Sequence, residues 1–357
     1  MKSTKIIILT PGFPKDEIDI NCIPSLQLLI QEMNEVDGVK IQIISTQYPF
    51  QFGTYQWHNI PVHACGGANR RYLFKALTYL KAIWFLLRFG RNASVVHGFW
   101  LYECGLLAAF WGWCINALSV VTVPGQDSKA GNGYFGIMRW WRKMKHLRIV
   151  SISDFGAKQL FQNAGIETDA ILPYGMHLSN LPTFDPTEER TMDVMGAGSL
   201  VPVKNYMEFL EVIALVKLVF PNIKACIAGG GFEQEMLSQR ILALGISKNM
   251  ELTGEIPRTQ VLERMSRSKI FLHTALWEGQ GFVLIESLAM GMYCVATSVG
   301  WLPPSDKSFA LGSSQEMAEI IIRILKNSRN HEPVPVLTMK ETVANYLRFY
   351  DQNIITT

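Results

Sequence analysis

The chain has 357 residues, 48% of them hydrophobic and 18% charged, and its formal net charge is +3. This is the composition of a globular protein, and the length exceeds most single cores, so two domains are expected. The six cysteines form no CxxC pair and do not cluster with histidines at metal-ligand spacing, which argues against a zinc site and indicates buried thiols in a reducing compartment. The apolar run 6–9 is too short for a signal peptide and predicts a first buried strand.

The small net charge hides an uneven distribution. Residues 1–180 hold 17 Lys and Arg against 11 Asp and Glu, a net of +6, whereas residues 181–357 hold 16 against 19, a net of −3. Between Gly38 and Tyr102, seven basic residues occur without an acidic one. The first half of the chain is therefore expected to face something anionic.

The first half predicts an open parallel sheet. Strand 6–9 is followed by a rigid Pro-Gly turn that contains Gly12, by a helix that begins at Pro24, and by a strand at 39–44. Further strands are expected at 95–96, 119–123 and 149–152. Polar residues such as His97 and Asp127 follow these strands, at the edge where ligands of such sheets bind.

Two basic, aromatic stretches lie in the same half. Residues 69–92 predict a helix that is apolar nearly all round, with basic residues too frequent for a membrane span. Such a helix can lie on an anionic membrane surface, and the run 139–148 has the same character. The alternative is a helix that packs on the sheet and extends its basic ends to solvent. Nucleic acid is not expected as a partner, because no nucleic-acid motif accompanies these charges.

The second half predicts a second sheet. A change in composition at 179–191, where prolines meet acidic residues, indicates a linker between domains. Strand, glycine turn and helix then recur with a period near thirty residues, which is typical of a doubly wound parallel sheet. An amphipathic helix is expected at 339–352, and it could pack back on the first domain. The predicted fold class is therefore α/β, with two Rossmann-like parallel-sheet domains.

The most informative stretch is 277–291. Glu278 and Glu286 stand eight positions apart, and Gly279-Gln280-Gly281 forms a strand-to-helix turn between them. Backbone N–H groups and the positive end of a helix dipole can bind an anion there, while the carboxylates can accept hydrogen bonds from hydroxyls. A phosphate flanked by hydroxyls describes a nucleotide-sugar. Lys204 is a point charge suited to a phosphate, although each of these features alone is more often structural.

Taken in order, the motifs of the second half resemble the donor-binding half of the retaining family 4 glycosyltransferases with the GT-B fold, the glycosyl transferases group 1. The likeness runs through Gly198, Lys204, Gly229-Gly230-Gly231, Thr253-Gly254 and the Glu278-x7-Glu286 pair. It implies two domains that face a cleft. Residues 1–180 would bind the acceptor, residues 181–338 would bind the nucleotide-sugar, and helix 339–357 would return to the first domain.

The resemblance also implies a role for each matching residue. Lys204 and the amides of 279–281 would bind the donor diphosphate, Glu278 the donor sugar, and Glu286 the ribose. Glu255 and Ile256 would meet the base, and Gly12 would let a loop of the first domain approach the phosphates. The rest of the implied donor site is Gly198, Ser199, Gly230, Gly231, Gly279, Gln280, Gly281, Phe282 and Val283. The expected catalytic set is Glu278, Lys204, His97 and Asp127.

No metal or other cofactor is expected, since the family generally needs none and the chain has no Asp-x-Asp pair. Two positions depart from the family pattern. Ser199 stands where an arginine usually lies beside the diphosphate, and Pro124 stands where a histidine is frequent. His97 and Asp127 also have structural alternatives, as a strand-end histidine with satisfied hydrogen bonds and as a turn-stabilising carboxylate.

The leading functional hypothesis is a retaining glycosyltransferase of the hexosyl or N-acetylhexosaminyl class. It would move a sugar from a UDP- or GDP-sugar to an acceptor hydroxyl in cell-surface glycan or glycolipid synthesis. The expected location is the cytoplasm, peripheral on the inner face of the cytoplasmic membrane. The alternatives are a degenerate GT-B protein that binds nucleotide-sugar or membrane without turnover, and a nucleotide-sugar epimerase on the same fold.

Overall fold

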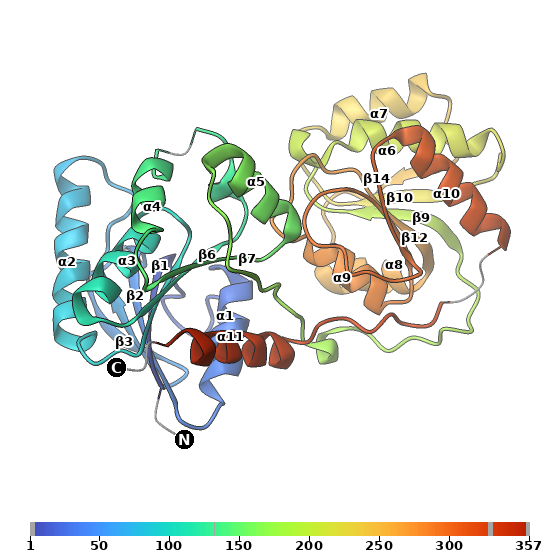
Figure 1. The fold of residues 1–357 in the computed structure, drawn as a ribbon. Coiled ribbons are helices and arrows are strands. Elements are labelled where there is room, and N and C mark those ends of the chain that lie inside the picture. The colour runs from blue at the N-terminus through green and yellow to red at the C-terminus, as the bar shows by residue number, and fades with distance from the viewer. Residues whose placement is uncertain (1–3, 132, 328–330, 355–357) are drawn as a thin grey trace. The chain divides into compact units, whose positions relative to one another are not determined.

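The computed structural model describes residues 4–131, 133–327 and 331–354. The chain divides into two compact units (Figure 1). Unit 1 comprises Met1–Gly175 together with Leu337–Thr357, and unit 2 comprises Met176–Val336.

Unit 1 is built on an eight-stranded sheet with the order β3-β4-β2-β1-β5-β6-β7-β8. Its strands are β1 (Thr4–Gly12), β2 (Val39–Tyr48), β3 (Gly53–Trp57), β4 (Ile60–Ala64), β5 (Val95–Phe99), β6 (Leu118–Val123), β7 (Leu147–Ser151) and β8 (Ala170–Ile171). All neighbours pair in parallel except β3 and β4, which form an antiparallel hairpin at one edge.

Helices cover both faces of this sheet (Figure 1). They are α1 (Pro24–Asn34), α2 (Leu73–Phe89), α3 (Glu103–Ile115), α4 (Phe135–Trp141), α5 (Asp154–Ala164) and α11 (Met339–Asn353), with a short 3₁₀ turn η1 (Gln126–Ser128). Alternate residues of a strand point to opposite faces, so Ile7 and Leu9 of β1 pack with α2 and α3. Helix α11 comes from the far end of the chain and packs beside α1.

Unit 2 is a six-stranded, fully parallel sheet with the order β11-β10-β9-β12-β13-β14. Its strands are β9 (Met192–Ala197), β10 (Ala225–Ala228), β11 (Met250–Leu252), β12 (Ser268–His273), β13 (Tyr293–Thr297) and β14 (Ser308–Leu311). Its helices are α6 (Tyr206–Lys217), α7 (Gln234–Ala243), α8 (Arg258–Ser266), α9 (Phe282–Ala289) and α10 (Ser314–Asn327), with 3₁₀ turns η2 (Leu178–Asn180) and η3 (Pro202–Lys204).

Two apolar clusters hold unit 2 together, one on each face of the sheet. Ile270 and Leu272 of β12 join α6, α7 and α10 on one face, while Phe271 joins α8 and α9 on the other. Burial on both faces explains why these strands read as continuous apolar runs in the sequence. The predicted α/β class with two Rossmann-like parallel-sheet domains is confirmed.

Several local details differ from the sequence-based expectations. The basic, aromatic helix is shorter than 69–92, because Asn69 and Tyr72 have positive φ and Gly90 ends it. The run expected at 139–148 is split between the end of α4 and the start of β7. All six cysteines are free, but Cys114 is exposed and Cys22 only half-buried, so the expectation of uniformly buried thiols is wrong for these two. Within the described ranges, no helix combines the length and hydropathy that a membrane span requires.

Candidate functional site

The carboxyl edge of the unit 2 sheet brings Lys204 and Glu278 together. Lys204 ends η3, which follows β9, and Glu278 lies in the loop after β12, 74 positions later. The Lys204 ammonium donates a hydrogen bond to Glu278 Oε1, and the two side chains are 21% and 16% exposed. His273 Nε2, at the end of β12, lies 3.4 Å from the same oxygen. The sequence predicted both residues of the ion pair for this site but not that they would bind one another.

The electrostatics of this group keep the carboxylate ionised. Burial on its own would raise the pKa of Glu278, but the His273 imidazole and the Lys204 charge outweigh it and hold that pKa below its ordinary value of 4.5. The pair is positioned by backbone links between its two loops. Thr274 Oγ1 donates to the Lys204 and Asn205 carbonyls at 3.2 and 3.0 Å, and Leu276 N donates to the Val203 carbonyl at 2.8 Å.

Helix α9 begins beside Glu278. Gly281 is its N-cap residue with φ of 80°, a left-handed conformation that favours glycine. As a glycine, this N-cap residue has no side chain to cap the helix, and no acidic residue lies in the first turn of this described segment. The Val283 amide belongs to the first turn of a helix, where N–H groups lack intrahelical carbonyl partners, and the positive end of the helix dipole lies there. The start of α9 can therefore receive an anion.

The loop after β13 supports this helix start. The Gln280 carbonyl accepts a hydrogen bond from Trp301 N at 2.8 Å, and the Gln280 side chain is buried. A Cβ at Gly300 would lie only 2.5 Å from the Gln280 carbonyl oxygen, so this position requires glycine, which also supplies its φ of 68°. Gly279 links Glu278 to Gln280 in the sequence.

The glycines of the earlier turns serve contacts between loops. The N–H groups of Gly198, Leu200 and Gly229 donate at 2.9, 2.9 and 3.0 Å to the carbonyls of Ala228, Gly230 and Gly254 respectively. A Cβ at Gly229 would lie 2.0 Å from the Gly198 carbonyl oxygen, and one at Gly231 would lie 2.3 Å from the Leu200 carbonyl oxygen. The sequence suggested that these glycines admit a ligand; in the structure they admit the neighbouring backbone.

Gly198 is constrained in a second way. A Cβ there would lie 3.1 Å from the Tyr206 hydroxyl, and the Gly198 φ of 146° is one that other residues rarely adopt. Ser199 is exposed next to it, and Gly230 packs against Glu255, whose own side chain is exposed. Ile256 is half-buried and joins the α8–α9 apolar cluster.

Glu286 has a partner that the sequence did not reveal. Arg258 Nη2, at the first position of α8, lies 2.5 Å from Glu286 Oε1. The Glu286 residue is 7% exposed, whereas the Arg258 side chain is 61% exposed. The one signal in the sequence that could have placed Arg258 near the site is its position two residues after Ile256, which was expected to meet the base. The arginine holds Glu286 at the edge of the same site.

Part of the chain is similar to a known protein family. Residues 186–333, all within unit 2, match the family described as glycosyl transferases group 1. Unit 2 is a glycosyl transferases group 1 domain. The resemblance predicted from the motifs is thereby confirmed.

Relatives and solved structures agree with this assignment. The chain is 27% identical over 146 residues to the phosphatidylinositol N-acetylglucosaminyltransferase gpi3 subunit of Schizosaccharomyces pombe, a match that covers 40% of this chain and 32% of that protein. It therefore spans about a third of the length of this curated relative. Among solved structures it is similar to Anabaena HepE in complex with UDP and glucose, with a TM-score of 0.63 and 16% identity over 98% of this chain and 95% of that one. A glycosyltransferase from Rickettsia africae gives a TM-score of 0.65 at 15% identity, over 99% and 100% of the two chains. These likenesses show the GT-B fold.

The remaining predicted residues belong to unit 1, and the structure gives His97 a buried position. Its Nδ1 lies 2.7 Å from the Tyr350 hydroxyl of α11, and its Nε2 lies 2.7 Å from Thr122 Oγ1. The residue is 1% exposed, and burial lowers the pKa of the imidazole to about 3. Both nitrogens are thus occupied within unit 1, which fits the structural alternative for this histidine.

Asp127 is likewise enclosed. Its two carboxylate oxygens accept hydrogen bonds from Leu101 N at 2.8 Å and Gly125 N at 3.1 Å. Burial raises the pKa of Asp127 to about 6, although these backbone hydrogen bonds act in the opposite direction. Gly12 ends β1 in a buried position, where its carbonyl accepts from Thr10 Oγ1 at 2.9 Å.

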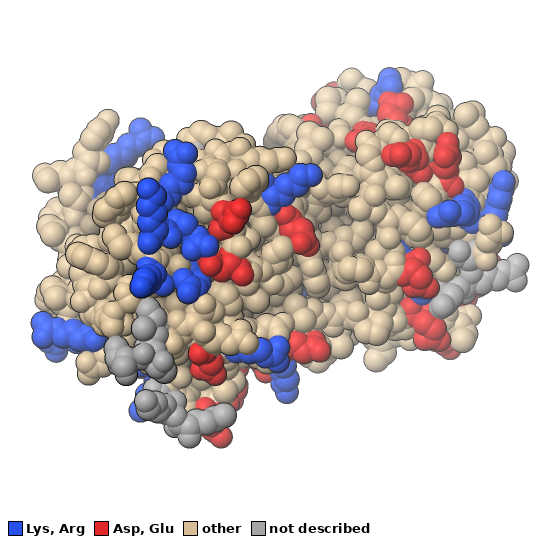
Figure 2. Space-filling view, viewed as in Figure 1, with Lys and Arg blue, Asp and Glu red and all other residues tan. Residues whose placement is uncertain are grey.

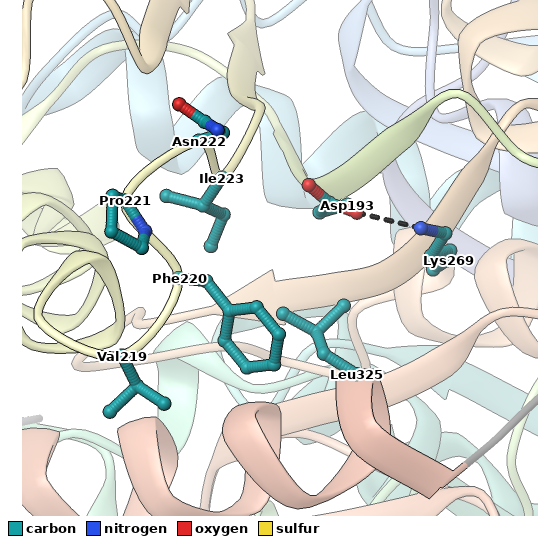
Figure 3. A pocket seen from close by; sticks show the side chains of 8 residues that line it. All are labelled: Asp193, Val219, Phe220, Pro221, Asn222, Ile223, Lys269 and Leu325. Atoms are coloured by element: carbon teal, nitrogen blue, oxygen red, sulfur yellow. Dashed lines mark hydrogen bonds and ion pairs between the residues drawn. The ribbon is translucent and has the colours of Figure 1, made fainter.

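A further pocket in unit 2 does not belong to this site. It has a volume of about 280 Å³ and lies where β9 and β12 begin, at the amino edge of the sheet (Figure 3). Asp193 and Lys269 form an ion pair there at 2.8 Å, beside apolar residues from the α6–β10 connection such as Phe220. Ligands of doubly wound sheets bind at the other edge. Across the described residues, no three His, Cys, Asp or Glu side chains cluster as metal ligands.

Proposed function

We propose that the chain transfers a sugar from a UDP- or GDP-sugar to an acceptor hydroxyl, with retention at the reacting carbon. The observation that carries this proposal is the Lys204–Glu278 pair in the loops beside the start of α9. UDP is the first donor base to test, because HepE, which is similar in fold, is known in complex with UDP and glucose.

The ion pair suggests how a donor would be received. The diphosphate carries more negative charge than one carboxylate, so it competes with Glu278 for the Lys204 ammonium. The positive end of the α9 dipole favours the same anion. The released Glu278 carboxylate then accepts hydrogen bonds from the sugar hydroxyls. Before the donor binds, Lys204 and Glu278 thus neutralise each other's charge. After the donor has bound, Lys204 contacts its diphosphate and Glu278 contacts its sugar.

The chemistry then depends mainly on stabilising the leaving group. The bond between the sugar carbon and the diphosphate oxygen breaks, and the acceptor oxygen attacks the same face of the sugar. The acceptor proton goes to the departing phosphate oxygen. Lys204 and the helix amides stabilise the charge that develops on the diphosphate, which is the largest kind of catalytic contribution for such a step. In this scheme Lys204 supplies the charge for which other enzymes use a metal.

Glu286 and Arg258 are proposed to bind the nucleoside. Glu286 is almost buried and is oriented by Arg258 at 2.5 Å, so it can accept hydrogen bonds from the ribose hydroxyls with little loss of side-chain freedom. The base would lie along Glu255 and Ile256. We assign His97 and Asp127 to the stability of unit 1 rather than to contact with substrate, because their polar atoms are bonded within that unit.

A lipid-linked or cell-surface acceptor is proposed on the basis of α2. One face of this helix is buried, yet the opposite face presents a stripe of exposed apolar residues at spacings of four and three: Leu73, Leu77, Leu80, Trp84 and Leu87. Figure 2 shows Lys and Arg side chains around α4 and at both ends of α2. An apolar stripe with basic ends suits the surface of an anionic membrane. The S. pombe relative, which is named for phosphatidylinositol, also fits a lipid acceptor.

The proposal is tested with purified protein and nucleoside diphosphates. UDP or GDP is expected to raise the melting temperature, since a ligand that binds only the folded state stabilises it by mass action. The matching nucleotide-sugar is expected to be hydrolysed slowly by wild type and not by Glu278→Gln. Binding of the nucleotide with equal, zero turnover by both proteins would instead favour the degenerate GT-B alternative.

Membrane contact is tested separately by co-sedimentation. The protein is expected to bind vesicles that contain phosphatidylserine at low ionic strength and to leave them at high ionic strength. Leu80→Glu on the exposed stripe should weaken this binding, whereas Lys224→Glu on the exposed surface of unit 2 should not. Equal binding to neutral and anionic vesicles would contradict the proposed anionic surface.

A further inference from the structure

Helices α2, α3 and α4 of unit 1 line an apolar pocket that opens to the surface. Its volume is about 530 Å³, within the range of about 300–1,000 Å³ that is usual for small-molecule sites. Leu106 and Phe110 of α3, Ile137 and Trp141 of α4, and Lys75 and Tyr79 of α2 are among its lining residues. The Phe110 and Trp141 rings contact each other edge to face, with centroids 6.4 Å apart. The pocket is thus built from three elements of one unit.

One part of the pocket wall is charged. Lys75 Nζ pairs with Glu103 Oε1, and the Tyr134 hydroxyl donates to the same carboxylate oxygen at 2.9 Å and accepts from Lys75 at 3.3 Å. Burial alone would raise the pKa of Glu103, but Lys75 and Tyr134 hold it below its ordinary value, so the pair stays charged. Glu103 is the first residue of α3 and closely follows β5, which places it at the carboxyl edge where ligands of open α/β sheets bind.

The rest of the wall is apolar and continues to the protein surface. Phe110 and Ile137 are 38% and 50% exposed. The Trp141 ring contacts the rings of Trp113 and Trp140 at centroid distances of 6.2 and 5.2 Å, and those two residues are 51% and 57% exposed. We call Trp113, Trp140 and Trp141 the aromatic rim. Tryptophan at an apolar surface next to basic side chains is typical of contact with lipid at a membrane–water boundary.

From this arrangement we propose that the pocket holds the hydrocarbon chain of an amphiphilic acceptor, with its polar end at Lys75, Glu103 and Tyr134. That this ligand is the acceptor of a sugar rests on the proposed function. That the pocket binds an amphiphile does not depend on it. A free sugar has too little apolar surface to match walls formed by Leu106, Phe110 and Ile137, whereas a hydrocarbon chain gains about 25 cal/mol for each Å² that it buries there.

The charges select the polar end of this ligand. Lys75 can bind a phosphate or other anionic group, and the Glu103 carboxylate can accept a hydrogen bond from a hydroxyl. Exposed Arg139 and Lys143, on and just after α4, add positive charge on the same stretch of chain as the rim. A lipid with an anionic, hydroxyl-bearing headgroup therefore matches both parts of the pocket.

The probe for this proposal is decyl phosphate below its micelle concentration, added to the full chain without nucleotide-sugar. Isothermal titration is expected to give one site per chain, with tryptophan fluorescence changing in parallel. Inorganic phosphate, which lacks the chain, is expected to bind at least about 100-fold more weakly. Absence of binding by decyl phosphate, or binding of inorganic phosphate with similar affinity, would overturn the proposal.

Two matched variants locate the site. Ile137→Glu places a charge in the pocket at a half-exposed position, and Leu87→Glu places one on the outer stripe of α2 at a position that is 43% exposed. Ile137→Glu is expected to weaken decyl phosphate at least tenfold, and Leu87→Glu less than twofold. Equal losses in both variants would assign the binding to general surface hydrophobicity and refute the pocket.

A third variant tests the shape of the pocket, and a binding assay without donor separates the lipid site from sugar transfer. Ile137→Trp fills the pocket without adding charge and is expected to weaken decyl phosphate about as much as Ile137→Glu; unchanged affinity would contradict the proposal. Because binding is measured without donor, failure of sugar transfer leaves this result unaffected. Conversely, an active enzyme with an empty pocket would retain the proposed function and lose only the lipid site.

Discussion

Two sets of polar residues occupy the same topological position, at the ends of parallel strands, but their surroundings differ. In unit 2, Lys204 and His273 both contact Glu278, and the Lys204 and Glu278 side chains remain partly exposed. In unit 1, His97 and Thr122 contact Tyr350 and Tyr346 of α11, and all four residues are buried. A strand end with polar residues is therefore a binding edge only where no helix closes over it. The following predictions test this contrast.

The largest effect is expected at Lys204. Replacing it with Ala removes the charge that would stabilise the leaving diphosphate, and kcat/KM for donor hydrolysis should fall by about 100-fold or more. Lys224→Ala, at an exposed lysine before β10, serves as the matched control and should leave the rate unchanged. Similar rates for wild type and Lys204→Ala would remove this lysine from the catalytic set.

A second prediction concerns the stability of unit 1. His97→Phe leaves the buried hydroxyls of Tyr350 and Thr122 without their imidazole partner, which should destabilise the fold by about 2 kcal/mol at pH 7.5. Urea unfolding measures this loss. Donor hydrolysis at low temperature should remain within about threefold of wild type; a large fall in kcat with unchanged stability would restore His97 as a catalytic residue.

The same variant should change the pH dependence of stability. Because burial lowers the pKa of His97 from 6.5 to about 3, the folded chain keeps a neutral imidazole while the unfolded chain takes up a proton below pH 6.5. The contribution is complete above pH 6.5 and falls by about 1.4 kcal/mol for each pH unit below it. At pH 5 wild type should have lost about 2 kcal/mol from this group. The gap between wild type and His97→Phe should then nearly close, and a constant gap would show that His97 titrates normally.

A smaller effect is expected at Arg258. Its replacement by Ala leaves Glu286 in place but no longer oriented, so KM for the nucleotide-sugar should rise by roughly fivefold, about 1 kcal/mol, with kcat little changed. The control is Arg264→Ala. Arg264 lies on the same helix α8 as Arg258, and its replacement breaks an exposed ion pair with Glu251. A fall in kcat at constant KM would contradict a role in nucleoside binding.

The sequence predicted the fold well because its signals are local. Apolar runs, glycine turns and helical spacing mark the strands of unit 2 from β9 to β13 and the helices between them, and amphipathic spacing marks α11. Strand β14 and helix α10 were not predicted. The β3–β4 hairpin was missed, since its turn at His58 and Asn59 has positive φ without the glycine that usually announces such a turn.

The candidate site could be predicted only in part, because its contacts are not local. Residue types and order indicated Lys204, Glu278 and Glu286, but no spacing shows that two residues 74 positions apart form an ion pair, or that Arg258 reaches Glu286. The partner of His97 lies 253 positions away on α11. Its two satisfied nitrogens favour the structural alternative, a choice that the sequence left open.

The central claim is that a donor diphosphate takes Lys204 from Glu278, and UDP titration of three proteins tests it most directly. Lys204→Met should weaken UDP by at least about tenfold relative to wild type. Glu278→Gln should bind UDP as tightly as wild type or more tightly, since it removes the carboxylate that competes for the lysine, and should still lose sugar transfer. The claim that the diphosphate replaces Glu278 as the partner of Lys204 would be contradicted by either of two results. One is that Glu278→Gln weakens UDP binding as much as Lys204→Met does, and the other is that neither variant changes UDP affinity.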